Sequence, residues 1–425
     1  MAFAILLPRS VNVNTSINTE NLSVNDLLES MECLTRSIIS RKGNKNMSKL
    51  LEQINKTRTT KRLGDLVAIN QSSIVNGFPY QEIEYVDTSS VTRNSFERPQ
   101  ILNINEAPSR AKRLLKDGDT ILSTVRPNQH HYGFIKNPKP NTVASTGFVV
   151  LTPKDINPFY LYSYLTQDVV TSTLNAIAEA TTTTFPAFRP EVLSEMEIEI
   201  PDLPTQKKIA SILNAYDSKI ENNNKIIKNL EATAQTIFNE WFVQFRFPDY
   251  EKVKMVESEM GPIPEGWEVK KIEYVMEFAY GKALISEDRT EGNYPVIGSS
   301  GTIGFNGRAL VDGPGIVVGR KGNAGSIIWI DDDFFPIDTT FYIKTNLSIY
   351  YCFFLLKKQT FSNSDSAVPG LSREDAYRQL VLISDKKIVR QFDRHIKEIF
   401  NFITLAKKEN RILKDARDRL LSKLI

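Results

Sequence analysis

The chain has 425 residues, of which 41% are hydrophobic and 24% charged, a composition typical of a soluble globular protein. At ~100 to 200 residues per domain, this length excludes a single ordinary domain and predicts two or three. The 53 basic and 50 acidic side chains give a net charge of +3, which excludes a uniformly basic nucleic-acid-binding body.

Residues 1–58 are expected to form an N-terminal extension outside the repeated part of the chain. The opening MAFAILLPRS has no charged segment and a short apolar run before Pro8, so no secretory signal is predicted. The stretch VNDLLESMECLTRSIIS has the pattern of an amphipathic helix, and Met47 is an alternative start. The simpler interpretation is a poorly ordered or packing extension.

The two cysteines, Cys33 and Cys352, are far apart and have no CxxC-type neighbours. Neither a zinc site nor a disulfide framework is therefore predicted, and a reduced, cytoplasmic setting is expected. No apolar stretch reaches ~18 residues, so no membrane span is predicted.

Residues 59–203 are predicted to be a strand-rich globular domain, and residues 204–244 a long helix with one apolar stripe. The stripe positions are separated alternately by four and three residues, as in a heptad seam, and ~40 residues make a rod of roughly 60 Å. The polar member, Asn223, lowers stability but can fix the register of paired helices. The seam consists of Ile209, Leu213, Tyr216, Ile220, Asn223, Ile227, Leu230, Ala234, Ile237 and Trp241.

Residues 245–267 carry Pro, Gly and acidic residues without periodicity and are predicted to be a linker. A second globular domain over 268–385 and a second long helix over 386–425 follow. Adding 183 to each seam position gives a second seam in which eight of ten residues are apolar, which indicates an internal repeat. Its members are Phe392, Ile396, Ile399, Ile403, Ala406, Asn410, Leu413, Arg417, Leu420 and Leu424.

The predicted fold class is α+β, with two similar strand-rich domains in tandem, each followed by a long helix. A helix with one apolar stripe is not stable alone, and the same chain supplies a second of equal length. We therefore expect the helices to pair as an antiparallel coiled coil with pseudo-two-fold symmetry. The alternative is that each helix packs only on its own domain. Two diverged modules in this arrangement suit a DNA duplex that is read at two different half-sites.

Four segments of the sequence resemble the DNA-specificity subunit of type I restriction-modification systems: IEIPDLPTQKKIASILNAYDSKI, GPIPEGWEVKKI and the hairpins STVRPNQHHYG and VVGRKGNAGS. The resemblance covers residues 59–425 and is weaker in the second helix, where ISDKKIVRQF lacks the Pro pair. The family's usual signal is a Pro-rich strand end, a Gln with a basic pair and an Ile/Leu seam. It is matched by Pro201, Pro204, Gln206, Lys207, Lys208, Ile209, Asp217 and Ile220.

The resemblance implies a non-catalytic subunit whose two target-recognition domains each read one half of a split site in double-stranded DNA. It implies that the helices set the spacer and bind two copies of the methyltransferase (modification) subunit, which carries S-adenosylmethionine. Restriction subunits, which use ATP and Mg²⁺, are expected to join that core. No cofactor is expected on this chain itself.

Two segments of each module are predicted to contact DNA, because they gather side chains suited to base edges and phosphates. One is the turn of the hairpin and the other is the polar loop before the long helix. The simpler interpretation is an exposed hairpin tip and a filler loop. The candidates are Arg126, Asn128, Gln129, His130, His131, Arg320, Lys321 and Asn323 in the turns, and Thr182, Thr183, Thr184, Arg189, Ser366 and Arg373 in the loops.

Two other function classes compete with DNA reading. A DNA adenine methyltransferase or another DNA-acting enzyme is suggested by NPFY at 157–160, although Phe159 replaces a proline and no Gly-rich turn precedes it. GRKGNAG is not a P-loop, since Gly322 follows the lysine. A coiled-coil scaffold that binds proteins would not need basic turns at equivalent points. His130 and His131 as metal ligands would lack a further ligand cluster, so no metal is predicted.

Overall fold

The computed structural model describes residues 41–75, 77–181, 186–361 and 370–425. These residues belong to two compact units, which are treated separately below. The first unit is drawn from Thr15–Glu221 with Arg411–Ile425, and the second is Asn222–Asn410. The predicted helix over 24–40 and the candidates Thr182, Thr183, Thr184 and Ser366 lie outside the described residues. Within the described ranges, no helix combines the length and the apolar character needed to cross a membrane.

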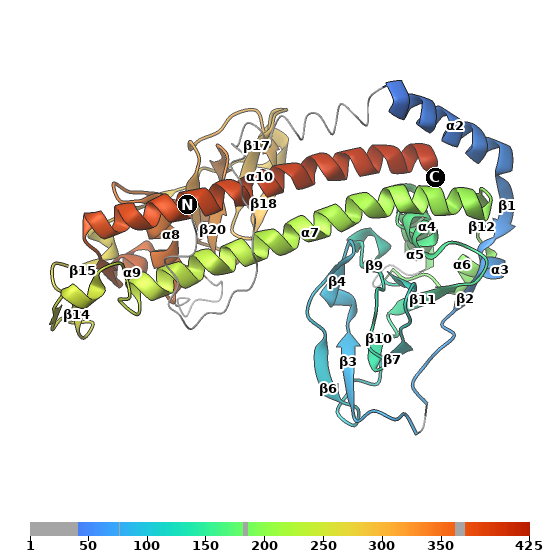
Figure 1. Cartoon of the computed structure of the whole chain (residues 1–425), viewed down its shortest axis with the longest axis horizontal. Helices are drawn as coiled ribbons and strands as arrows, with labels where there is room; N and C mark the ends of the chain where they lie inside the picture. The colour runs from blue at the N-terminus through green and yellow to red at the C-terminus, as the bar shows by residue number, and fades with distance from the viewer. Residues whose placement is uncertain (1–40, 76, 182–185, 362–369) are drawn as a thin grey trace. The chain divides into compact units, whose positions relative to one another are not determined.

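The first unit is built around an antiparallel sheet with the order β2-β11-β8-β9 (Figure 1). Its central strand β8 is buried along its whole length, which explains the apolar run before the turn at residue 124. A second sheet has the order β6-β3-β10-β7 and contains one parallel pair, β3 with β10. The strands are β2 (Val67–Ile69), β3 (Glu82–Val86), β6 (Gln100–Asn103), β7 (Ala111–Leu114), β8 (Thr120–Ser123), β9 (Tyr132–Phe134), β10 (Thr142–Ser145) and β11 (Phe148–Pro153).

Short elements complete the first unit. The helix α2 (Arg41–Thr57) contributes Leu50 and Ile54 to the same core as the main sheet. The apolar segment after β11 forms two helices, because α4 ends at Leu165 and α5 begins at Asp168. The remaining elements are β1 (Thr59–Arg62), α3 (Leu63–Leu66), η2 (Thr88–Ser90), β4 (Val91–Thr92), β5 (Ser95–Phe96), η3 (Pro127–Gln129), α4 (Pro158–Leu165), α5 (Asp168–Thr181), α6 (Glu191–Glu195) and β12 (Glu197–Ile200).

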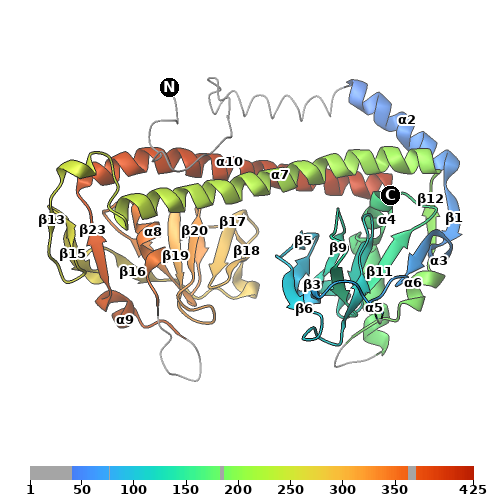
Figure 2. The ribbon, with the colours of Figure 1, turned by 60° about the horizontal axis from the view of Figure 1, so that its bottom comes forward.

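The second unit repeats the topology of the main sheet strand by strand, whereas its second sheet has three strands in place of four. Its main sheet has the order β16-β22-β19-β20, and Figure 2 labels three of its strands, β16, β19 and β20. Its second sheet, β18-β17-β21, again contains one parallel pair, β17 with β21. The elements are β15 (Glu268–Lys271), η5 (Ile272–Tyr274), β16 (Glu277–Tyr280), η6 (Ser286–Asp288), β17 (Tyr294–Gly298), β18 (Gly301–Asn306), β19 (Gly315–Gly319), β20 (Ile327–Ile330), β21 (Phe335–Pro336), β22 (Thr340–Lys344), α8 (Ile349–Lys358), α9 (Arg373–Arg378) and β23 (Leu380–Ile383).

The segment 245–267, which was predicted to be an aperiodic linker, is folded against the second unit. It contains η4 (Tyr250–Lys252) and a small hairpin of β13 (Met255–Val256) and β14 (Ile263–Pro264). Phe247 and Trp267 stack with their ring centroids 5.3 Å apart, and both are buried. The aromatic residues therefore anchor a segment whose polar composition alone suggested a free connection.

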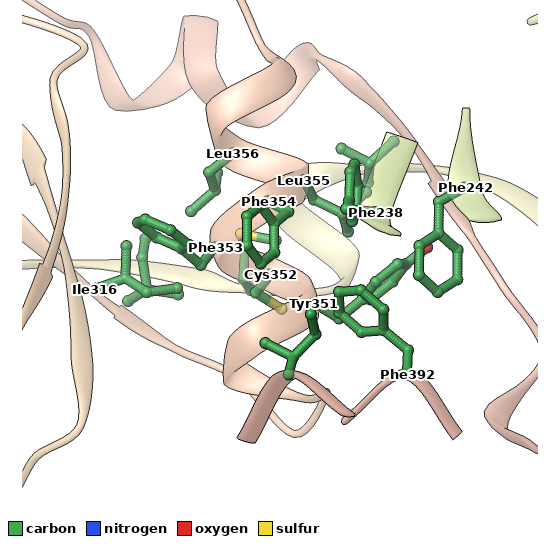
Figure 3. Close-up of a cluster of buried hydrophobic side chains, with 14 of the residues drawn as sticks. Phe238, Phe242, Ile316, Tyr351, Cys352, Phe353, Phe354, Leu355, Leu356 and Phe392 are labelled. Atoms are coloured by element: carbon green, nitrogen blue, oxygen red, sulfur yellow. The ribbon is translucent and has the colours of Figure 1, made fainter. Parts of the chain in front are cut away.

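The two long helices are α7 (Leu203–Phe242) and α10 (Lys386–Leu424). In the second unit, Phe238 and Phe242, near the end of α7, pack with Phe392, near the start of α10, and with Tyr351 and Phe354 of α8 (Figure 3). In the first unit the opposite ends of the two helices meet: Ile209 and Leu213, near the start of α7, share a core with Leu424, at the end of α10.

The two helices therefore run antiparallel in each unit. The predicted α+β fold class is confirmed: two strand-rich modules in tandem are each followed by a long helix, and these helices pair as a coiled coil. None of the predicted seam positions is exposed. The buried ones are Ile209, Leu213, Ile220, Asn223, Ala234, Trp241, Phe392, Ile396, Ile399, Ile403, Asn410 and Leu424, and the half-buried ones are Tyr216, Ile227, Leu230, Ile237, Ala406, Leu413, Arg417 and Leu420.

Candidate nucleic-acid interface

In the first unit, the two segments predicted to contact DNA are joined by backbone hydrogen bonds. Val125 in the hairpin turn forms an antiparallel bridge with Ala187 in the loop before α6. The N–H of Arg126 donates to the carbonyl of Pro186 at 2.9 Å, and the N–H of Phe188 donates to the carbonyl of Thr124 at 3.0 Å. Segments about sixty residues apart in sequence thus form one surface.

The second unit has the same connection at equivalent positions. Lys321 in its hairpin turn forms an antiparallel bridge with Gly370, which is Ala187 shifted by the repeat length of 183. The N–H of Leu371 donates to the carbonyl of Arg320 at 2.8 Å, as Phe188 does to Thr124. The repeat therefore preserves the joint between turn and loop although the side chains differ.

The turn of the first unit holds a constrained backbone. Arg126 and His130, which flank η3, have φ values of 47° and 56°, in the left-handed region that non-glycine residues rarely occupy. Arg126, Asn128 and Gln129 are exposed, and so is Arg189 in the adjoining loop. These four predicted side chains are placed where a duplex could reach them.

The rings of the two histidines in this turn pack within the protein. The Nδ1 of His131 donates to the carbonyl of Val91 at 2.7 Å, which fixes its ring against β4. The Nδ1 of His130 is buried and has no hydrogen-bond partner among the residues with defined positions. Burial, followed by the charge of Arg93, lowers the pKa of His130 below its usual value, so its ring is neutral at pH 7. Both rings are thus less available to DNA than their neighbours in the turn.

Sequence reasoning missed Arg93, an exposed cation beside this turn. Arg93 and Asn94 form the two-residue turn between β4 and β5, with φ values of 46° and 63°. The N–H of Arg93 donates to the carbonyl of His130 at 2.9 Å, which places the two turns side by side. The signal in the sequence was weak, because Arg-Asn is not one of the glycine-containing pairs that favour a two-residue hairpin turn.

The predicted cations of the second unit also come together. Lys321 and Asn323 are exposed, whereas Arg320 and Arg373 are half-buried. The guanidinium carbons of both arginines lie near the ring centroid of Tyr280, at 5.0 Å and 4.9 Å. Tyr280 was not predicted, since it lies forty residues before Arg320 on another strand.

The segment NPFY has a structural role. The side chain of Asn157 caps α4 by accepting a hydrogen bond from the N–H of Tyr160 at 3.0 Å, and Phe159 and Tyr160 are buried in the core. An aromatic pair in the core cannot receive a flipped base. In the described ranges, no group of three His, Cys, Asp or Glu residues could hold a metal ion.

A protein-family model, described as the type I restriction modification DNA specificity domain, matches residues 55–232 and 264–407. The chain belongs to this family. Each matched range of the specificity domain contains one of the two modules, from its first strands into the long helix that follows. The family is that of the DNA-recognition component of type I restriction-modification systems, which is non-catalytic, and it does not favour the methyltransferase alternative.

Several specificity subunits are similar to this chain. The type I restriction enzyme HindI specificity subunit of Haemophilus influenzae is 35% identical over 43% of this chain and 40% of its own length. The type I restriction enzyme MjaIX specificity subunit of Methanocaldococcus jannaschii is 26% identical over 85% of this chain and 86% of its own length. The solved type I S subunit from M. genitalium has a TM-score of 0.51 at 18% identity, over 87% of this chain and 96% of that one, and supports the fold.

Proposed function

We propose that this chain is the specificity subunit of a type I restriction-modification complex and that each module reads one half of a bipartite site in double-stranded DNA. The observation that carries the proposal is the repeated joint between hairpin turn and loop, found in both modules of a DNA specificity family. A shared backbone with different side chains suits two unlike half-sites.

The exposed donors at these joints are the proposed DNA contacts. Asn128 and Gln129 have the amides suited to adenine, and Arg126, Lys321 and Arg189 the cations suited to guanine or phosphate. Arg93 joins them. Thr182, Thr183, Thr184, Ser366, Asn323, Arg320 and Arg373 complete the proposed set, and His130 and His131 act mainly by shaping the turn.

The long helices have a second proposed role. Paired antiparallel, α7 and α10 set the length of the unread spacer and dock two methyltransferase subunits, to which restriction subunits attach. S-adenosylmethionine, ATP and Mg²⁺ would belong to those partners. The target-recognition domains are proposed to span 59–203 and 268–385, joined through 245–267, and the complex to act on DNA in the cytoplasm.

The test uses the full chain purified with its methyltransferase subunits. The complex should retard a duplex that carries the site and should release it as the salt concentration rises. Binding of cations to DNA phosphates releases the counterions of the DNA into solution, and added salt opposes that release. The same protein should bind a scrambled duplex far more weakly. Absence of any salt-dependent, sequence-dependent binding would contradict the proposal, and methyl transfer by this chain alone would favour an enzyme.

A further inference from the structure

Three elements of the second unit bring one aromatic ring and two arginines together. Tyr280 ends β16, Arg320 follows β19, and Arg373 begins α9. The guanidinium carbon of Arg320 lies 5.0 Å from the ring centroid of Tyr280, and that of Arg373 lies 4.9 Å from it. Tyr280 is 47% exposed, so this cluster is at the surface.

Arg320 is held from both its backbone and its side chain. Its N–H donates to the carbonyl of Thr339 at 2.9 Å, and its carbonyl accepts the N–H of Leu371 at 2.8 Å. Its Nη1 donates to the carbonyl of Asp338 at 2.9 Å. A guanidinium has five N–H donors, so this anchor leaves most of the group able to bind something else.

Arg373 is placed by the start of α9. The preceding residue, Ser372, caps this helix by accepting the N–H of Asp375. The guanidinium carbon of Arg373 also lies 5.7 Å from the ring of Tyr377. Across the residues with described positions, neither Arg320 nor Arg373 forms an ion pair with a carboxylate. Two positive groups are thus collected on aromatic rings rather than neutralised.

Stacking on an aromatic face has a specific effect on arginine. It holds the planar fork in one orientation while its edge remains free to donate, and it reduces the side-chain entropy lost on binding. A fixed guanidinium fork matches the O6 and N7 acceptors of guanine in the major groove. Phosphate oxygens can accept the same fork, so replacing the N7 of guanine is needed to separate the two ligands.

We propose that Tyr280 is a positioning residue that orients Arg320 and Arg373, and that at least one of these arginines reads guanine in the half-site of the second module. This inference rests on the proposed function. It identifies the base class that the second module selects and the residues that select it.

The first module cannot make the same contact. The backbone hydrogen bond from Leu371 to Arg320 in the second module corresponds to the one from Phe188 to Thr124 in the first. Thr124 is therefore the residue of the first module that is equivalent to Arg320. The repeat length of 183 carries Pro190 onto Arg373. The arginine pair is therefore expected to act on one half-site only, which gives the test an internal control.

The experiment compares substitutions that separate charge from geometry, in the full chain with its methyltransferase subunits. Arg320→Lys and Arg373→Lys keep the charge and lose the planar fork. Tyr280→Phe keeps the aromatic face, and Tyr280→Leu removes it. Each complex is titrated with a duplex that carries the sequence that the wild-type complex methylates. It is also titrated with duplexes in which 7-deazaguanine, which lacks N7, replaces single guanines.

For the wild type, one 7-deazaguanine in the second half-site should weaken binding by about 10-fold or more. At least one Arg→Lys variant should bind the normal site as weakly as the wild type binds the 7-deazaguanine duplex. The affinity of that variant should not fall further when 7-deazaguanine replaces the guanine. Tyr280→Phe should behave as the wild type, and Tyr280→Leu should lose most of the preference for guanine while its thermal midpoint stays unchanged. A replacement in the first half-site should affect all these proteins equally.

A second half-site of A·T pairs alone would overturn the inference, and so would Lys variants that keep the full response to 7-deazaguanine, which would place the arginines on phosphates. In both cases DNA binding itself would survive, and with it the proposed function. A complex without salt-dependent DNA binding would overturn both.

Discussion

The side-chain amide of Asn223 on α7 donates a hydrogen bond to the side-chain oxygen of Asn410 on α10, at 3.0 Å. The two residues are 2% and 6% exposed, so this amide pair lies inside a seam that is otherwise mostly apolar. Asn410 in turn donates to the side chain of Asn224 at 2.9 Å. A one-heptad slip of either helix would bury these amides against apolar side chains without partners.

Replacing Asn223 with Leu should therefore destabilise the protein, by ~1 to 3 kcal/mol, because the side-chain oxygen of Asn410 stays buried without its donor. The double replacement Asn223→Leu with Asn410→Leu should recover most of that loss but widen the range of spacers accepted, since no buried polar pair then fixes the register. Urea unfolding and binding to duplexes of varied spacer length measure the two effects. The exposed neighbour Asn222→Leu is the matched control and should change neither.

Lengthening both helices by one heptad should lengthen the accepted spacer. Seven residues inserted after Glu221, with seven after Asn410, add ~10 Å, or roughly 3 base pairs. The half-site sequences should stay the same, because both inserts fall at the boundary between the two units and outside the contacts of Thr404 and Lys407 with Asp331. Methylation mapping measures both properties. If the half-sites changed while the spacer did not, the helices would not set the spacing.

Arg126→Ala should weaken or relax recognition of the first half-site and leave the second intact. Arg126 is exposed at the joint of the first module, whereas the second module has its own joint at Lys321. Loss of one base contact costs ~1 to 3 kcal/mol at that position. Competition with duplexes mutated in either half-site measures the loss. Equal loss at both half-sites would refute independent modules.

Asp331 is expected to hold the second module on α10. Its carboxylate accepts hydrogen bonds from the indole of Trp329 at 2.9 Å, the hydroxyl of Thr404 at 2.7 Å and the ammonium of Lys407 at 3.1 Å. Asp331→Asn should lower stability by ~1 to 3 kcal/mol, because a neutral amide oxygen accepts more weakly from Trp329 and Thr404 and the amide NH2 cannot accept from the ammonium of Lys407.

The adjacent Asp332 provides the control for that prediction. It pairs with Lys408 at 3.5 Å, and both side chains are about half exposed. Such a surface pair contributes ~0 to 1 kcal/mol, so Asp332→Asn should leave the thermal midpoint nearly unchanged. Equal effects of the two substitutions would show that the hydrogen bonds of Asp331 do not hold the module.

The sequence predicted the long helices well because a seam has a period that local residues reveal. Even the two non-apolar members of the seam on α10 have partners on α7. Asn410 accepts a hydrogen bond from Asn223, and Arg417 forms an ion pair with Asp217 at 2.7 Å. The sheets were less predictable. Only Thr146 and Gly147 separate β10 from β11, yet the two strands belong to different sheets, because the chain turns away after Ser145.

The candidate interface was predictable only in part. Donor-rich turns such as that of Arg126 are visible in sequence, and so is the loop of Arg189. The position of Tyr280 beneath two arginines depends on the pairing of β16 with β22 and on the start of α9, which no local pattern specifies. The role of His131 was also hidden, since its partner, the carbonyl of Val91, lies forty residues away.

Methylation mapping tests the central claim most directly. DNA from cells that express this chain with its methyltransferase subunits is compared with DNA from cells that lack the chain. The account predicts methylated adenines in one bipartite site, with two unlike half-sites separated by an unread spacer of fixed length. Methylation that is unchanged by loss of this chain, or a continuous site without a spacer, would contradict it.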